Sequence, residues 1–265
     1  MSTPKVIIPF IWIYTLFGLA SLFVLPNDWW YTLLFFLIFV FGNGTVAHRY
    51  FSHKSFKVAR PVHWLLAFWV TITGYSPIAY WMVQHMHHHR HTDSPNDVHS
   101  PVNGFFKSFF LWTVDRKRVE SIFKERSSIA LYISCMRDPA IKFFNTYFIP
   151  VNILLLLTLG LLDLQLLYSI GAAYVLEQIR LGTLNTALHT PSFPFSYRNH
   201  PDVDDRSQNN YILGFLTFGF GWHNNHHKSA SKLILTERWW EIDFEGYLGW
   251  LLSLTYRGKD DSYTR

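Results

Sequence analysis

Histidine is the residue type whose spacing most clearly predicts chemistry in this chain. Nine of the 14 histidines fall in four short groups. The groups are His48 and His53; His85, His88 and His89; His189, with Asn185 one helical turn before it; and His223, His226 and His227. Offsets of three and four residues bring side chains to one face of a helix, where imidazoles can converge on a cation. The pattern therefore predicts a metal site built from histidines.

The number of these histidines limits the kind of metal site. A zinc ion takes four protein ligands, or three when it is catalytic, so nine histidines predict two metals. Imidazole suits iron, copper, nickel and zinc, so the ligand type alone leaves the metal open. Cys135 is the only cysteine, which excludes a cysteine-built zinc or iron–sulfur site. No Glu-x-x-His pair occurs, so the site differs from the carboxylate-rich dimetal sites of soluble helical bundles.

Some spacings predict local structure, and others point away from a metal role. His48 and His53 lie about 140° apart on an ideal α-helix, so we expect the helix to end between them. His87 and His91 occupy another face of their helix, and we interpret them as supporting or exposed residues instead of ligands. Glu177 and Arg180 are three residues apart within an apolar run, and we expect them to pair with each other.

The elements that must position these histidines are those of a membrane protein. Hydrophobic residues make up 49% of the chain and form long runs. Four of these runs predict transmembrane helices in two hairpins, at residues 6–25, 32–50, 143–162 and 164–188. Residues 49–142 contain 13 Lys and Arg and residues 198–265 contain eight, whereas the hairpin turns contain none. By the positive-inside rule, both termini and the histidines lie in the cytoplasm.

The predicted fold is thus an all-α integral membrane protein of one domain, residues 1–265. Residues 51–142 and 189–265 form a cytoplasmic helical cap that holds the histidine-rich dimetal site. The apolar run from Val62 to Tyr80 would be a fifth span by hydropathy alone. If it crossed the membrane, the histidines before and after it would face opposite compartments. We therefore expect this run to stay on one side, broken at Gly74 and Pro77.

With these groups in view, the chain resembles the membrane fatty-acid desaturases. That family is marked by three histidine boxes of the forms HxxxxH, HxxHH and HxxHH, and all three occur here in order. The likeness runs from about Phe41 to His227 and includes Trp81, Asp97 and His99. It implies that two irons are held by His48, His53, His85, His88, His89, His189, His223, His226 and His227. It also implies that Asn185 reaches one iron through a water molecule.

The resemblance implies O₂-dependent desaturation of a fatty-acyl chain, with no catalytic residue beyond the metal site and no other bound cofactor. A membrane diiron hydroxylase of an alkyl, sterol or carotenoid substrate is the alternative, because both reactions begin with the same oxidant. A membrane zinc hydrolase or metal carrier is a rival from another class. Val83 and Gln84 stand before His85 where acyl-CoA desaturases commonly have Arg-Asp, so the acyl group could be linked to CoA, a carrier protein or a lipid.

The same reading predicts the partners and the location. Electrons would come from a separate ferredoxin or cytochrome b5 type protein, whose acidic surface suits a chain of net charge +5. Anionic membrane lipids suit the same basic surface, and nucleic acid does not, because the basic residues flank membrane segments. The expected location is a bacterial inner membrane or the endoplasmic reticulum.

Overall fold

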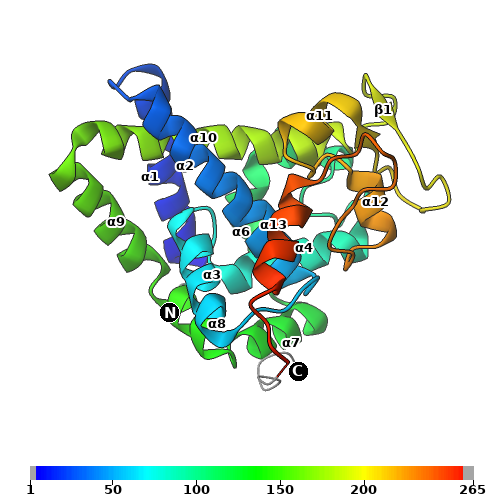
Figure 1. Cartoon of the computed structure of the whole chain (residues 1–265), viewed down its shortest axis with the longest axis horizontal. Helices are drawn as coiled ribbons and strands as arrows, with labels where there is room; N and C mark the ends of the chain where they lie inside the picture. Colours follow the sequence, from blue (N-terminus) through cyan, green and yellow to red (C-terminus); the bar gives the residue numbers. More distant parts are fainter. Residues whose placement is uncertain (1–3, 259–265) are drawn as a thin grey trace.

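The computed structural model describes residues 4–258, and the chain folds mainly into helices (Figure 1). The first half contains α1 (Pro4–Phe23), α2 (Trp29–Phe41), the π-helix η1 (Gly42–Ser52), α3 (Arg60–Ile72), α4 (Ile78–His91), η2 (Pro101–Asn103), α5 (Phe105–Phe109), η3 (Leu111–Thr113), α6 (Arg116–Ile122) and α7 (Arg126–Cys135). The second half contains α8 (Pro139–Thr146), α9 (Phe148–Leu162), α10 (Leu164–Ala187), β1 (Ser196–Tyr197), β2 (Asn209–Asn210), α11 (Tyr211–Leu216), α12 (His223–Lys228) and α13 (Phe244–Ser253).

Two helical stretches are long and apolar enough to cross a membrane. They are α1 and the continuous run of α2 with η1, Trp29–Ser52. A third is added if α8 and α9, which meet at a bend of 64°, count as one span. The helix α10 falls outside this group because Glu177, Gln178 and Arg180 lower its hydropathy. The predicted helices are thus present, but the number of spans supported by length and composition is two or three, not four.

The turns between the apolar helices follow from their polar residues. The carboxylate of Asp28 caps α2 by accepting hydrogen bonds from the backbone N–H groups of Trp30 and Tyr31, at 2.8 and 3.0 Å. Asp163 caps α10 in the same way through the N–H of Gln165, at 2.8 Å. Such caps satisfy backbone donors that have no partner inside the helix. Both chain reversals therefore lie at the turns that the sequence predicts.

The apolar run from Val62 to Tyr80 is broken into two helices. The helix α3 ends at Ile72, and Gly74 adopts a left-handed backbone conformation with φ of +68°. Pro77 then precedes the first residue of α4. These are the two predicted break points, and each has a physical cause, since glycine tolerates positive φ and proline suits the start of a helix. The break allows α4 to carry its histidines back towards η1.

The π-helix η1 explains how His48 and His53 come together. The helix ends at Ser52, between the two histidines, as predicted. In a π-helix each N–H bonds to the carbonyl five residues earlier, and the N–H of His53 donates to the His48 carbonyl at 3.1 Å. Residues five apart then lie nearly above one another, and the two rings are 4.8 Å apart between centroids. The 140° separation of an ideal α-helix does not apply here.

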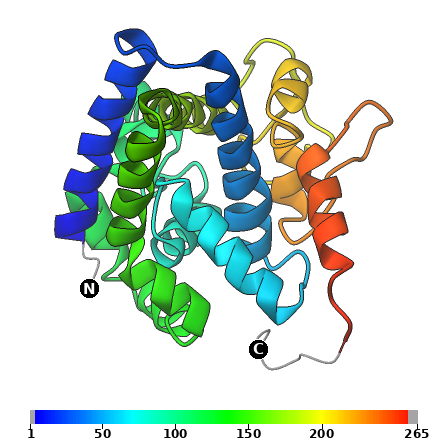
Figure 2. The ribbon, with the colours of Figure 1, turned by 60° about the vertical axis from the view of Figure 1, so that its left-hand side comes forward.

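The third histidine box is held by a small polar framework. Strands β1 and β2 pair antiparallel, with Tyr197 opposite Asn209. The Asn209 side-chain oxygen accepts hydrogen bonds from the backbone N–H groups of Asn224 and Asn225, at 2.9 and 3.2 Å. Asn225 in turn donates to a carboxylate oxygen of Glu241 at 2.9 Å. These bonds fix the start of α12. Figure 2 shows the last helix, α13, in red near one edge of the molecule.

A buried ion network joins η1, α10 and α13. Arg49 in η1 donates two hydrogen bonds to the carboxylate of Asp243, at 2.7 and 2.8 Å. Arg180 donates two to Glu177 at 2.7 and 2.8 Å, which confirms the predicted pair. Glu245 lies between the two arginines, and burial raises its pKa to about 8, although Arg180 and Arg49 act in the opposite direction. A neutral Glu245 leaves two arginines balanced by two carboxylates.

Candidate metal centre

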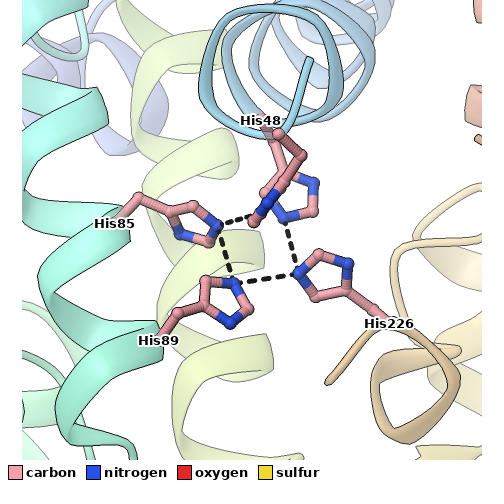
Figure 3. A group of neighbouring side chains, drawn as sticks. His48, His85, His89 and His226 are labelled. Atoms are coloured by element: carbon pink, nitrogen blue, oxygen red, sulfur yellow. Dashed lines mark hydrogen bonds between the residues drawn. The ribbon is translucent and has the colours of Figure 1, made fainter. Parts of the chain in front are cut away.

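The structure brings all nine predicted histidines together in two adjoining groups. The five-histidine group contains His48, His53, His85, His89 and His226, and the four-histidine group contains His88, His189, His223 and His227. Within each group the ligating nitrogens lie within 4.8 Å of one another. Figure 3 shows four of the rings of the first group turned towards one another from η1, α4 and α12. Segments 178 residues apart in the chain therefore meet at one point.

The distances within the groups suit metal ligation. Facing Nε2 atoms are 2.7 to 3.1 Å apart in the five-histidine group. They are 3.0 to 3.4 Å apart in the four-histidine group. Two metal–nitrogen bonds of about 2.0–2.1 Å at a right angle would place the nitrogens about 2.9 Å apart. The rings thus already have the spacing of ligands around a shared cation.

Three carboxylates orient the four-histidine group. The Nδ1–H groups of His88, His189 and His227 donate to Asp97 at 2.9 Å, Asp93 at 3.0 Å and Asp205 at 2.7 Å, respectively. This bond places the proton on Nδ1 and leaves the Nε2 lone pair for a cation.

Among the described residues, the five-histidine group has no equivalent carboxylate, and Nδ1 of His48 is buried without a hydrogen-bond partner. The two groups therefore differ in charge: the four-histidine group has three supporting carboxylates within hydrogen-bonding distance, and the other is surrounded by neutral rings.

Burial favours the neutral form of most of these rings. It lowers the pKa of His85, His88 and His226, and the neighbouring histidines lower it further. His189 is the exception: burial also acts to lower its pKa, but the hydrogen bond and charge of Asp93 outweigh that effect and raise the pKa overall. A metal ligand must be unprotonated at the atom it offers, so the buried neutral rings suit the donor set.

Asn185 lies on α10 one turn before His189, at the end of the helix nearest the four-histidine group. Its side chain is half-buried. Within residues 4–258 its amide makes no hydrogen bond to another residue, in contrast to the asparagines of the cap such as Asn209 and Asn225. A neutral amide of this kind can orient a water molecule without adding charge to the site.

The remaining histidines divide into supporting and separate residues. The ring of His99 lies 4.1 Å from that of His88, between centroids, and its backbone N–H donates to Asp97. His63 accepts or donates a hydrogen bond with Tyr50 and lies 3.1 Å from Asp138. His87 and His91 face away from both groups and lie near Glu125 instead. None of these four is part of the nine-histidine set.

The supporting carboxylates show where the sequence reasoning was incomplete. Asp97 was noted within the resemblance, but Asp93 and Asp205 were not identified. Asp93 lies four residues after His89, and Asp205 lies in a loop about 20 residues before its partner His227. Asp93 could have been noted from its place one helical turn after His89, whereas nothing in the spacing points to Asp205.

Replacing Asp205 by asparagine tests that role. We expect Asp205→Asn to weaken metal binding at the four-histidine group by about 10- to 100-fold, because His227 loses the acceptor that fixes its tautomer. The measurement is metal retained per chain during competition with a chelator. The matched control is Asp202→Asn in the same loop, whose carboxylate is 62% exposed and pairs with Lys228. Equal iron retention in the two variants would contradict the assignment.

A narrow apolar cleft approaches the metal centre from α1. It is lined by Ile7, Ile8 and Ile11 on one side and by Trp81, Gln84 and Trp112 on the other. The Trp81 ring stacks parallel to His85 at 5.7 Å, and Trp112 contacts His99 at 5.1 Å. The indole N–H groups of Trp81 and Trp112 are buried and have no acceptor among the described residues. These two N–H groups are therefore able to donate to a ligand or a water molecule.

A second cavity, of about 430 Å³, lies on another side of α4. Its walls include Phe51, Met82 and Leu131, with Lys54 and Arg137 at its polar part. Its lining includes His63, which lies outside the nine-histidine set, and, among the described residues, no residue that stacks on one of the nine rings as Trp81 does on His85.

Comparison with known proteins identifies the family. The model of the fatty acid desaturase family matches residues 27–233. The chain is 29% identical over 244 residues to "Delta-9 acyl-lipid desaturase 2" of Arabidopsis thaliana, covering 89% of this chain and 76% of that protein. It is 30% identical over 240 residues to "sn-2 palmitoyl-lipid 9-desaturase" of Nostoc sp. (strain 36), covering 86% and 81%.

The chain is also similar to a relative whose name specifies an acyl-CoA substrate. The chain is 27% identical over 233 residues to "Acyl-CoA C20 Delta5-desaturase" of Anemone leveillei, covering 86% of this chain and 71% of that protein. The family match covers all three histidine boxes and most of the chain. With its mostly helical fold and its two histidine groups able to hold metal, this chain belongs to the fatty acid desaturase family and is an enzyme of that kind.

Proposed function

We propose that this protein desaturates a fatty-acyl chain in an O₂-dependent reaction at a diiron centre formed by the nine histidines. The observation that carries the proposal is the pair of histidine groups, whose nitrogens already have ligand spacing. The proposed ligands are His48, His53, His85, His89 and His226 for one iron, and His88, His189, His223 and His227 for the other. Asn185 would hold a water molecule beside the second group.

The histidine donor set is compatible with iron, and the match to the fatty acid desaturase family favours it. When bound, the irons would supply the oxidant, made from O₂ and two electrons, that an unactivated methylene C–H bond requires. The residues of the chain have two other roles. Asp93, Asp97 and Asp205 fix the tautomers of the histidine rings that they accept from, and the buried surroundings keep bulk water away from the site. Two hydrogens leave from adjacent carbons, so the chain must present one pair of methylenes and hold it there.

We assign the acyl chain to the Trp81 cleft. Its isoleucines come from α1, one of the two helices apolar enough to cross a membrane, so a lipid chain could enter from the bilayer side. The unpartnered N–H groups of Trp81 and Trp112 would donate to a carbonyl or headgroup oxygen of the substrate. The cleft has a volume of about 20 Å³, enough for about one water molecule. To admit an acyl chain, α1 would move away from α4.

A lipid-linked acyl group is the proposed form of the substrate. Two of the relatives act on acyl lipids by name, and Gln84 stands beside the cleft where a charged residue would suit CoA better. We further propose that α10 joins the apolar helices as a fourth span, in a single domain whose histidine-bearing cap and termini face the cytoplasm. An acidic electron donor, of ferredoxin or cytochrome b5 type, would dock on the basic cap.

Expression in a host with a compatible donor tests the function. The measurement is the fatty-acyl profile of each lipid class and of the acyl-CoA pool, together with iron and zinc per purified chain. New double bonds in lipid-linked chains with two irons per chain support the proposal. New double bonds confined to acyl-CoA would overturn the substrate form. Hydroxylated products would favour the hydroxylase alternative, and one zinc without iron would exclude the oxygenase.

A further inference from the structure

A separate set of metal-type ligands lies on another face of α4. His87 and His91 on α4 and Glu125 before α7 offer ligand atoms that all lie within 4.8 Å of one another. None of the three belongs to the nine-histidine set. On an ideal helix, His87 and His91 lie about 130° around α4 from the histidines of the second box. The two sets of ligands therefore face different surroundings.

The two histidines lie at different distances from Glu125. His87 Nε2 lies 2.9 Å from one carboxylate oxygen of Glu125, which is a hydrogen-bond distance. His91 Nε2 lies 3.8 Å from the other oxygen, which is too long for a hydrogen bond. Two metal–ligand bonds of about 2.0–2.1 Å at a tetrahedral angle separate their donor atoms by about 3.4 Å. Each of the two distances to Glu125 differs from this separation by about half an ångström.

We propose that His87, His91 and Glu125 form a mononuclear site for a divalent transition metal, with zinc as the best match. Two histidines four residues apart on a helix place both rings on one side of it, as zinc sites require. A carboxylate from a second segment completes a His₂Glu set and leaves one coordination position for water. The side chains of His91 and Glu125 are 32% and 37% exposed, so an ion can reach the site from solvent.

The residues around this site affect its affinity for zinc. Arg90 lies between the two histidines in sequence and donates to Ser128 of α7, so a positive charge is close to the site. Lys124 and Arg126 flank Glu125 in sequence. These cations and the three-ligand set make the site weaker than a structural zinc site, with a dissociation constant on the order of 1 μM. A bound ion would link α4, which carries the second histidine box, to the start of α7.

The test uses the full chain loaded with iron. The purified enzyme and its His91→Gln and Glu125→Gln variants are dialysed to equilibrium against a buffer with a few micromolar free Zn²⁺, and zinc and iron per chain are measured without a wash. We expect the unmodified enzyme to retain one zinc in addition to its iron. Each variant should bind zinc at least about tenfold more weakly, with iron content unchanged. His91 is partly exposed, so its replacement should leave the fold intact.

The matched control is His200→Gln. His200 Nε2 lies 2.7 Å from Glu237, and among residues 4–258 no third metal-type ligand joins this pair. This variant should retain zinc like the unmodified enzyme. The proposal is overturned if the unmodified enzyme retains no zinc, if His91→Gln retains as much as it does, or if His200→Gln loses it. Iron content and desaturation report on the nine-histidine site, so failure of one assignment is distinguishable from failure of the other.

Discussion

Replacing His88 or His226 by alanine is expected to abolish product formation, with a loss of more than about 100-fold, and to release the metal of the affected group. His88 belongs to the four-histidine group and His226 to the five-histidine group. Each variant removes one ligand bond, and the proposed ligands that remain in each group are all histidines. The measurements are iron per chain and product formed with a matched electron donor.

Asn185→Ala separates the effect on turnover from the effect on iron content. We expect it to retain nearly all the iron, because every histidine remains, and to lose most of its turnover, because the proposed water loses its partner. His189→Ala, one turn away, should lose both. Near-normal turnover in both His88→Ala and His226→Ala would refute the ligand assignment. Equal iron loss in Asn185→Ala and His189→Ala would refute the role of the water.

Arg49→Met is expected to destabilise the fold by about 3–5 kcal/mol. The side chain of Arg49 is 2% exposed, and that of its partner Asp243 is fully buried. Methionine keeps most of the aliphatic volume but leaves the Asp243 carboxylate buried without its ion pair. Because Arg49 follows His48 in η1, loosening this contact should also weaken iron binding in the five-histidine group. The measurements are the thermal unfolding midpoint in detergent and iron per chain.

Two further variants separate the buried charge from other effects of the substitution. Combining Arg49→Met with Asp243→Leu removes both charges, and we expect it to recover part of the lost stability. Arg116→Met removes the arginine of an exposed pair with Glu120 and should leave the unfolding midpoint nearly unchanged. If Arg49→Met unfolds at the same temperature as Arg116→Met, the buried network does not stabilise the fold as described.

The histidines of the second and third boxes could be predicted as groups because their spacing is a local property of the chain. Offsets of three and four residues place side chains on one helical face whatever surrounds the helix. The break at Gly74 and Pro77 was predictable for the same reason, since both residues restrict the backbone locally. The paired Glu177 and Arg180 likewise lie one turn apart on a single helix.

Properties that depend on distant segments were harder to predict. The helix α10 is predicted to be a span, but Glu177, Gln178 and Arg180 lower its hydropathy. Glu177 and Arg180 are paired inside the protein with residues of η1 and α13. Hydropathy counts composition and does not distinguish a polar residue that faces lipid from one that is paired inside the protein. The number of spans therefore could not be read from the apolar runs alone.

By itself the sequence determined the residues able to hold metal, the helices that carry them and the family of the protein. Only the tertiary structure decided how the histidines divide into groups of five and four, because His88 and His89 are neighbours in α4 yet point into different groups. It also decided that Asp93 and Asp205 support the four-histidine group, and that His87 and His91 meet Glu125. Periodicity fixes the face of a helix on which a side chain lies, whereas its partners come from folding of distant segments.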